Sequence, residues 1–155
     1  MNLFFTPDYA KTGDVIPFYN EAAGRFDHYY LKNWNPDAPR DKIVHGWHRI
    51  STRDNRHYDE LPTGIRGGTG SVILVDGVYH MFYCKFTHNP ERQYVWHATS
   101  EDMNTWTELP EETFGPDEKY YALTDWRDPF VFFDDSDNLY HMLLAARLTE
   151  GAAPR

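Results

Sequence analysis

Short apolar runs separated by tight polar turns recur along the chain. Each of three such runs leads into a turn and then into a second run that is rich in aromatic residues. The apolar runs cover 15–19, 72–75 and 130–133, and the turns that follow them contain 21–24, 76–77 and 134–138. The second turn is Asp76-Gly77, and Asp-Gly between apolar runs is the strongest short signal for a β-hairpin. The pattern therefore predicts three β-hairpins.

Two later segments share the pattern Trp-His-x-x-Ser. They run from Trp47 to Ser51 and from Trp96 to Ser100, and an acidic residue and a polar stretch follow each of them. One unit then contains an apolar strand, a turn, an aromatic strand, a Trp-His strand and a polar strand. Four strands in roughly fifty residues are typical of a β-propeller blade. The stretch 142–150 fits a helix by composition, and it fits equally well as the second strand of a third unit.

We therefore expect an all-β fold of the β-propeller type, present here as about two and a half blades. The expected blades cover approximately 10–62, 63–112 and, incompletely, 113–155. Few propellers close with fewer than four blades, so we expect the chain to be part of a longer protein. A blade edge left open near residue 145 would pair with another chain, which predicts self-association.

A polar residue stands near the start of each predicted first strand. These residues are Asp14, Ser71 and Asp128, and both intervals between them are 57 positions. The first strand of each propeller blade lines the central channel. The equal spacing therefore predicts that the three side chains point into one axial pocket.

Composition narrows the possible partners and compartments. The 155 residues carry 15 basic and 24 acidic side chains, a net charge of −9, which disfavours nucleic acid as a partner. No apolar run approaches the 18 residues of a membrane span, and no signal peptide is evident. The single cysteine, Cys84, favours a cytoplasmic location, with secretion after cleavage of a leader left open. The 17% of aromatic residues fits either a β-rich core or a carbohydrate site.

The sequence predicts neither a metal site nor a cofactor. None of the eight histidines pairs with another histidine or the cysteine at zinc-ligand spacing. The acidic stretch 134–138 lacks the glycine and distal glutamate of an EF-hand, so we expect a solvated hairpin turn there.

Four stretches, taken in order, resemble motifs of glycoside hydrolase family 32. They are Gly13-Asp14-Val15-Ile16-Pro17-Phe18-Tyr19, Gly68-Thr69-Gly70-Ser71-Val72, His97-Ala98-Thr99-Ser100-Glu101-Asp102 with Trp106, and Trp126-Arg127-Asp128-Pro129-Phe130. The family comprises invertases, levanases and other β-fructosidases. The resemblance implies the N-terminal part of a five-bladed β-propeller catalytic domain and a carbohydrate substrate of the fructoside type.

By this resemblance Asp14 would be the nucleophile of a retaining glycosidase and Asp128 would stabilise the transition state. Retaining hydrolysis needs a nucleophilic carboxylate and, about 5 Å away, a second carboxyl group as acid and base. Negative charge near the ring stabilises the oxocarbenium-like transition state. Arg127 would hold a carboxylate by bidentate bonding or reach oxygens of the substrate. The resemblance also implies four further substrate-binding residues: Asn33, Trp47, Thr69 and Ser71.

Two of these positions depart from the family pattern. Asn33 stands where the family usually has a glutamine, which is longer. Trp47 is offset by one residue from the family's tryptophan, and such a shift turns a strand side chain to the opposite face. Both a stacking platform and a core position therefore remain open for Trp47.

The third carboxylate of the family has no counterpart among the 155 residues. The acid/base of the family is a glutamate in a Glu-Cys motif after Arg-Asp-Pro, whereas Cys84 follows a tyrosine and precedes Arg127. We therefore expect this chain alone to be inactive. Two alternatives stay open: an inverting arabinosidase or xylosidase of family 43, and a non-catalytic sugar-binding propeller remnant.

Overall fold

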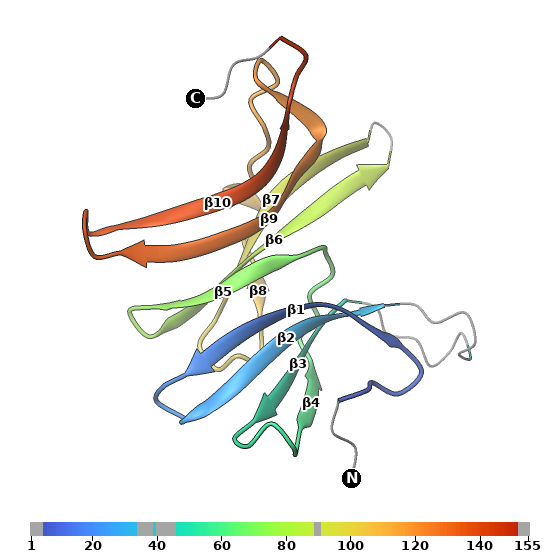
Figure 1. Cartoon of the computed structure of the whole chain (residues 1–155), viewed down its shortest axis with the longest axis vertical. Coiled ribbons are helices and arrows are strands. Elements are labelled where there is room, and N and C mark those ends of the chain that lie inside the picture. Colours follow the sequence, from blue (N-terminus) through green and yellow to red (C-terminus); the bar gives the residue numbers. More distant parts are fainter. Residues whose placement is uncertain (1–4, 34–38, 40–45, 89–90, 152–155) are drawn as a thin grey trace. The chain divides into compact units, whose positions relative to one another are not determined.

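The computed structural model describes residues 5–33, 39, 46–88 and 91–151, and it divides the chain into two compact units, Met1–Arg66 and Gly67–Arg155. Strands make up the regular structure of both units, and the described residues contain no α-helix (Figure 1). This confirms the predicted all-β fold. The strands are β1 (Lys11–Asn20), β2 (Arg25–Asn33), β3 (Gly46–Thr52), β4 (Asp59–Pro62), β5 (Gly70–Val75), β6 (Val78–His88), β7 (Glu91–Ser100), β8 (Thr107–Glu108), β9 (Tyr121–Asp134) and β10 (Leu139–Leu148).

The first unit is a four-stranded antiparallel sheet in the order β1-β2-β3-β4. The turn between β1 and β2 closes because the side chain of Asn20 accepts the N–H of Ala23 and because Gly24 takes a positive φ of 57°. Tyr29 of β2 and Trp47 of β3 are among its fully buried side chains, with ring centroids 6.1 Å apart. Aromatic residues therefore form part of the core of this blade.

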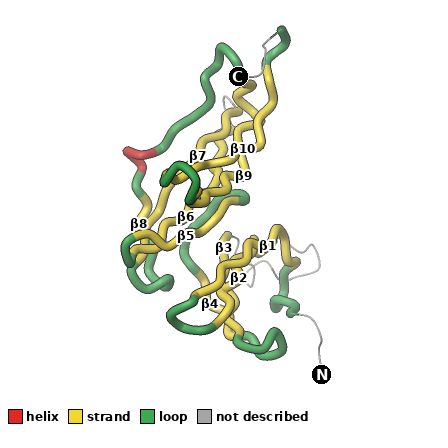
Figure 2. Tube along the Cα trace, turned by 60° about the vertical axis from the view of Figure 1, so that its left-hand side comes forward, coloured by secondary structure: helices red, strands yellow, loops and turns green. Residues whose placement is uncertain are grey.

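The second unit contains a four-stranded sheet, β5-β6-β7-β8, and the hairpin β9-β10. Asp76 and Gly77 connect β5 to β6 with positive φ at both residues, which fits the predicted tight hairpin turn. The short helical turn η2 (Pro110–Glu112) lies between β8 and β9 (Figure 2). The stretch that begins at Met142 is part of β10 and so is the second strand of the third repeat, as one of the two interpretations held.

Strand β9 packs against β5, β6 and β7 of the second unit. Two polar links accompany this packing. The backbone N–H of Val131 donates to the hydroxyl of Ser71 at 3.0 Å, and the backbone N–H of Trp126 donates to Oε1 of Gln93 at 3.0 Å. The third hairpin is therefore fixed to the second blade by specific hydrogen bonds as well as by apolar contact.

The loops after β3 and β7 are built in the same way. Thr52 accepts the backbone N–H groups of Asp54 and Asn55, as Ser100 accepts those of Asp102 and Met103. The carboxylates of the two aspartates then accept the N–H groups two and three residues further on. Equivalent positions of these two loops therefore lie 48 residues apart.

This equivalence corrects the match between the two Trp-His-x-x-Ser segments, which lie 49 residues apart. Trp47 pairs with Leu31 and Val95 pairs with Cys84, so Val95 is the residue that corresponds to Trp47. Trp47 is 1% exposed, whereas Trp96 is half-buried and the ammonium of Lys85 lies over its ring. The two tryptophans thus occupy opposite faces of their sheets, because a shift of one residue reverses the face.

One polar cluster is present in both complete sheets. Tyr30 and Lys32 of β2 donate to the carboxylate of Glu60 on β4, and the ammonium of Lys32 lies 2.8 Å from it. In the second unit Tyr83 and Lys85 donate to Glu108 on β8, each at 2.5 Å. In each blade the cluster ties the outermost strand to the second strand across the third.

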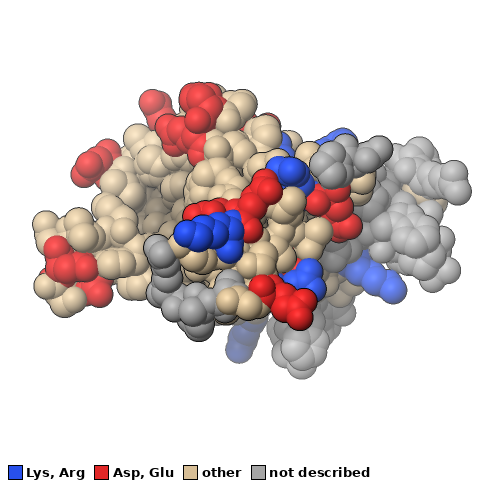
Figure 3. All heavy atoms as spheres, turned by 90° about the horizontal axis from the view of Figure 1, so that it is seen from above, with Lys and Arg blue, Asp and Glu red and all other residues tan. Residues whose placement is uncertain are grey.

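Charged side chains are interspersed on the surface that Figure 3 presents. Lys and Arg side chains stand in small groups beside Asp and Glu, and among the described residues of this face they form no continuous basic area. Within the described residues, no helix has the length and the apolar composition needed to cross a bilayer.

The Glu60 cluster leads to a prediction about acid stability. Burial raises the pKa of the Glu60 carboxyl, but hydrogen bonds from Lys32 and Tyr30 outweigh burial and hold this pKa below its ordinary value of 4.5. Ionised Glu60 therefore stabilises the fold above about pH 4.5, and this contribution is lost as the pH falls through the lowered pKa.

We expect Glu60→Gln to lower the free energy of unfolding at pH 7 by about 1–2 kcal/mol. The difference from wild type should shrink between pH 5 and about pH 3 as Glu60 is protonated in the wild type. Urea denaturation across this range measures both effects. Asp59→Asn, an exposed change on the same strand, is the control and should stay within about 0.5 kcal/mol of wild type. A cost for Glu60→Gln that does not depend on pH would contradict the assignment.

Candidate functional site

The first strands β1 and β9 each carry one extra residue, and the segment directly before β5 has one at the matching place. Asp14, Thr69 and Asp128 each stand six positions before the last paired residue of their hairpin's first strand. Opposite them the pairing slips by one residue, which is a β-bulge. The equal intervals of 57 positions predicted that Ser71 is equivalent to Asp14 and Asp128. The strand pairing shows that Thr69 is the equivalent residue instead. Bulges re-aim side chains and are frequent next to active sites.

Asp14 is the bulged residue of the first unit. Gly13 pairs with Leu31 and Val15 pairs with Tyr30, so Asp14 is the extra residue at the register shift between these two pairs. Its side chain is exposed. A carboxylate placed in this way can meet a ligand without the strand having to open. Asp128 belongs to the second unit, and each residue is described within its own unit.

Asp128 is the bulged residue of β9 and has the left-handed backbone conformation, with φ of 56°. Aspartate tolerates this region better than most side chains, but the conformation still costs about 1–3 kcal/mol and persists only where the surroundings enforce it. The next residue, Pro129, is fully buried and anchors the bulge. The Asp128 side chain remains 44% exposed. The backbone is thus fixed while the carboxylate is accessible.

Arg127 lies between two carboxylates. Its Nη1 is 3.2 Å from Oδ1 of Asp125, and its Nε is 3.8 Å from Oδ2 of Asp128. The 3.8 Å contact is an ion pair rather than a hydrogen bond. The role of Arg127 in holding a carboxylate or reaching the substrate stays a prediction. Its side chain is 45% exposed, so part of the guanidinium is available to a ligand.

Asp125 was not among the site residues that the sequence predicted. Asp125 lies in β9, where it bonds Arg127 with one oxygen and Nη2 of Arg147 with the other, at 2.6 Å. Arg147 comes from β10, so this link depends on the register of the hairpin. The sequence shows only that Asp125 is two residues from Arg127. This spacing does not predict the contact with Arg147.

The segment before β5 is rich in glycine because its backbone lies very close to β6. A Cβ at Gly70 would lie 1.8 Å from the carbonyl oxygen of Phe82, and a Cβ at Gly68 would lie 2.7 Å from Sγ of Cys84. Only glycine fits at these positions. Thr69 is half-buried between them, and its carbonyl accepts the N–H of Cys84 at 3.3 Å.

Ser71 lies inside the second unit. It is 2% exposed, and its hydroxyl accepts the backbone N–H of Val131. This places its oxygen in the contact between β5 and β9. A substrate-binding role for Ser71 was predicted, and the observed bond gives the hydroxyl a structural partner.

Trp47 and Asn33 stand in the first unit. Trp47 is 1% exposed and packs near Tyr29, so the core interpretation fits, and the ring offers no open face for a sugar in this structure. Asn33 ends β2 opposite Lys11, and its side chain lies outside the described residues. The substrate-binding role of Asn33 stays a prediction.

Cys84 lies opposite the glycine-rich segment before β5, where its carbonyl accepts the N–H of Gly68 at 2.7 Å. Its side chain is 4% exposed. Burial raises the pKa of the thiol and the Asp128 carboxylate raises it further, while backbone N–H groups of Gly68 and Asp128 and the charge of Arg127 act in the opposite direction. The thiol is therefore neutral at physiological pH.

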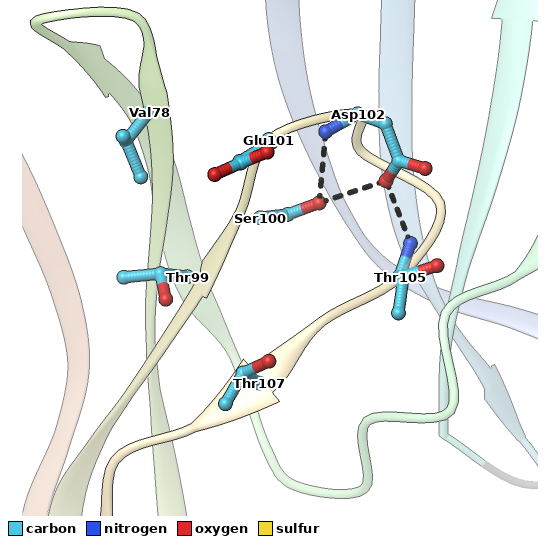
Figure 4. A pocket seen from close by; sticks show the side chains of 7 residues that line it. All are labelled: Val78, Thr99, Ser100, Glu101, Asp102, Thr105 and Thr107. Carbon is cyan, nitrogen blue, oxygen red and sulfur yellow. Dashed lines mark hydrogen bonds between the residues drawn. The ribbon is translucent and has the colours of Figure 1, made fainter.

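A hollow of about 520 Å³ in the second unit lies at the other end of the blade from Thr69. Figure 4 shows Ser100, Asp102 and Thr105 joined by hydrogen bonds along its wall, with Val78 and Glu101 nearby. A hollow of about 220 Å³ lies against the equivalent loop of the first unit, including Asp54. Because both blades have it, the hollow follows from the repeated loop geometry and not from a site particular to one blade.

Among the described residues, Asp134, Asp137 and His141 bring possible cation ligands within 4.8 Å of one another. Their polar atoms already serve the β9–β10 turn. Asp134 accepts the N–H of Ser136, and Asp137 accepts the N–H of Leu139 and contacts Nε2 of His141 at 2.8 Å. These bonds account for the cluster as part of the turn.

The family of the chain follows from comparison with known domains. The domain described as "Glycosyl hydrolases family 32 N-terminal domain" matches residues 17–153. The chain therefore belongs to glycosyl hydrolase family 32. None of the curated protein sequences compared with the chain matches it.

Solved structures agree on the fold. Sucrose-6-phosphate hydrolase from Lactobacillus gasseri superimposes with a TM-score of 0.72 and 20% identity over 90% of this chain and 30% of that chain. A β-fructofuranosidase from Schwanniomyces occidentalis complexed with fructosyl-erythritol superimposes with a TM-score of 0.68 and 20% identity, over 90% of this chain and 30% of that chain. Fructan 1-exohydrolase IIa from Cichorium intybus in complex with 1-kestose superimposes with a TM-score of 0.69 and 19% identity, over 90% of this chain and 28% of that chain.

The chain thus spans about 30% of the length of each of these proteins. This coverage fits the fold prediction of about two and a half blades of a five-bladed propeller. At such low identity the likeness concerns the fold, and function has to be argued from the site.

The position of Ser71 leads to a second prediction. Ser71→Ala should lower the free energy of unfolding by about 1–3 kcal/mol, because it leaves the Val131 N–H without its acceptor. Urea denaturation measures the change. The control is Ser136→Ala in the exposed β9–β10 turn, which should cost less than about 0.5 kcal/mol. Equal stability of Ser71→Ala and wild type would show that the hydroxyl does not hold β9.

Proposed function

We propose that the protein containing this chain is a glycoside hydrolase that cleaves β-fructofuranosides of the sucrose and fructan type. The observation that carries the proposal is the placement of Asp14 and Asp128 at the same bulge position of their hairpins in a chain of family 32. Both carboxylates are accessible, which a sugar site requires. The carbohydrate ligands named for the solved structures support fructosides as the substrate class.

Asp14 is the proposed nucleophile of a retaining reaction. One oxygen of its carboxylate attacks the anomeric carbon of the fructosyl group, and the bond from that carbon to the leaving oxygen breaks with its electron pair. Water then attacks the same carbon and releases the carboxylate. The exposure of Asp14, together with its place outside the ladder, supports this role.

Asp128 is the proposed stabiliser of the transition state. Its negative charge favours the developing positive charge of the fructosyl ring, and its oxygens accept hydrogen bonds from sugar hydroxyls. The positive charge of Arg127 faces this carboxylate and favours one direction for it, while Asp125 binds the same guanidinium through Nη1. A fixed, charged arrangement of this kind stabilises a transition state because it does not have to reorganise.

The proton donor of the proposed reaction lies in the part of the family domain that this chain does not span. Protonation of the leaving oxygen contributes about 10²–10⁴-fold to the rate. We therefore propose that the 155 residues by themselves do not hydrolyse unactivated substrates at an appreciable rate.

Carboxylate-to-amide variants of the complete protein test the proposal. We expect Asp14→Asn to lower kcat for sucrose or 1-kestose on the order of 10⁴-fold. Asp128→Asn should lower kcat by about 10²–10³-fold. The melting temperature of Asp14→Asn should change by less than about 2 °C because its side chain is exposed.

Fructose release and thermal unfolding are measured on the same samples, and Asp59→Asn serves as a control for an exposed carboxylate of the first unit. Activity that survives Asp14→Asn would sink the nucleophile assignment. A wild-type protein that binds but does not cleave any fructoside would favour the non-catalytic alternative.

The stereochemistry of the first product separates the proposed mechanism from the inverting alternative. A retaining enzyme releases β-fructofuranose first, whereas an inverting enzyme releases the α-anomer. Proton NMR that follows the reaction before mutarotation distinguishes them. Initial appearance of an α-anomer, or of arabinose or xylose from the corresponding glycosides alone, would support a family 43-type activity instead.

A further inference from the structure

Strands β9 and β10 pair irregularly at a second place beyond the Asp128 bulge. Ala146 pairs with Trp126 and Leu148 pairs with Tyr121, so one residue of β10, Arg147, stands opposite the four residues 122–125 of β9. Extra residues on one strand interrupt the regular ladder. The segment 122–125 therefore depends more on side-chain contacts than a regular pair of strands does.

The side chain of Arg147 supplies such contacts. Its Nη2 lies 2.6 Å from Oδ2 of Asp125 and donates to the hydroxyl of Thr124 at 3.0 Å. The Thr124 hydroxyl in turn donates to the same carboxylate oxygen at 3.4 Å. An isolated ion pair on the surface contributes little, but here each of the three groups contacts the other two, and such a network restricts all of them.

The Asp125 carboxylate transmits this restriction to Arg127. A carboxylate is rigid and planar, so contacts that hold Oδ2 also direct Oδ1, which lies 3.2 Å from Nη1 of Arg127. The arginine side chain is long and flexible, and an anchor on one edge of its guanidinium removes much of that freedom before a ligand arrives. The other edge faces Asp128, with Nε 3.8 Å from Oδ2.

We propose that Arg147 is a positioning residue for Arg127, and that it acts through the carboxylate of Asp125. In this way β10 determines where positive charge stands beside Asp128 on β9. The effect of Arg147 on catalysis rests on the proposed hydrolase function, whereas its effect on the Arg127 side chain does not.

Relaxation of the side-chain Nε–H of Arg127, measured by NMR on the ¹⁵N-labelled 155-residue chain, tests the structural link. Arg147→Met should lower the order parameter of this group by about 0.2, because Asp125 is then free to turn. Arg147→Lys should restore part of the order, since an ammonium also pairs with a carboxylate. The control is Arg92→Met, which removes an exposed ion pair with Glu118 in the same unit and should leave Arg127 unchanged.

An Arg127 order parameter that is the same in wild type and Arg147→Met would overturn the proposal. A double variant gives a second check. In the background of Asp125→Asn, Arg147→Met should cause no further loss of order, because the carboxylate that links the two arginines is already gone. Independent, additive losses would overturn the route through Asp125.

The complete protein tests the catalytic consequence. Arg147→Met should lower kcat for a fructoside by about fivefold with KM within about twofold, Arg147→Lys should recover part of the rate, and Arg92→Met should keep it. An unchanged kcat together with a lowered order parameter of Arg127 would overturn the positioning role. If wild type cleaves no fructoside, the proposed function fails, and the order parameters alone decide whether Arg147 holds Arg127.

Discussion

In a pair of antiparallel strands, each residue of one strand stands opposite one residue of the other. A single extra residue in one strand therefore interrupts this regular pairing and forms a β-bulge. In this chain the extra residue occurs at the same place in all three hairpins, as Asp14, Thr69 and Asp128. Its side chain no longer follows the alternation of the strand. Within its own unit, each of the two carboxylates, Asp14 and Asp128, takes its direction from this local irregularity, and the regular ladder on either side supplies rigidity.

The surroundings of Asp128 show what maintains such a conformation. The strained backbone is followed by the fully buried Pro129. On the open side Arg127 faces the carboxylate and is itself bonded by Asp125. Backbone strain at a residue that faces solvent is typical of functional sites. The fixed direction of a charge can lower a reaction barrier because the charge does not have to reorganise. This physical reason links the bulge to the proposed hydrolase function.

The hairpins could be predicted from the sequence because their signals are local. Asp76-Gly77 has the two positive φ values that a tight turn requires, and the apolar runs before each turn form the first strands. The fold class followed from the repetition of these signals. The motif resemblance also identified the family, because the matched stretches kept their order along the chain.

Register could not be predicted, because a bulge has no local signature in an alternating pattern. Equal spacing therefore selected Ser71 instead of Thr69, and the match of Trp47 with Trp96 was wrong by one residue. Asp125 was missed for a related reason. Its partner Arg147 lies on another strand, β10, and such a contact exists only once the strands are paired.

The central claim is that Asp14, placed outside the ladder, forms a bond to the sugar. Mass spectrometry after reaction with an aryl β-fructofuranoside tests this most directly, because its leaving group departs without a proton donor. We expect one fructosyl group on the peptide that contains Asp14, and no adduct on that peptide in Asp14→Asn. A fructosyl group on a different carboxylate, or turnover of the fructoside without any covalent adduct, would contradict the account.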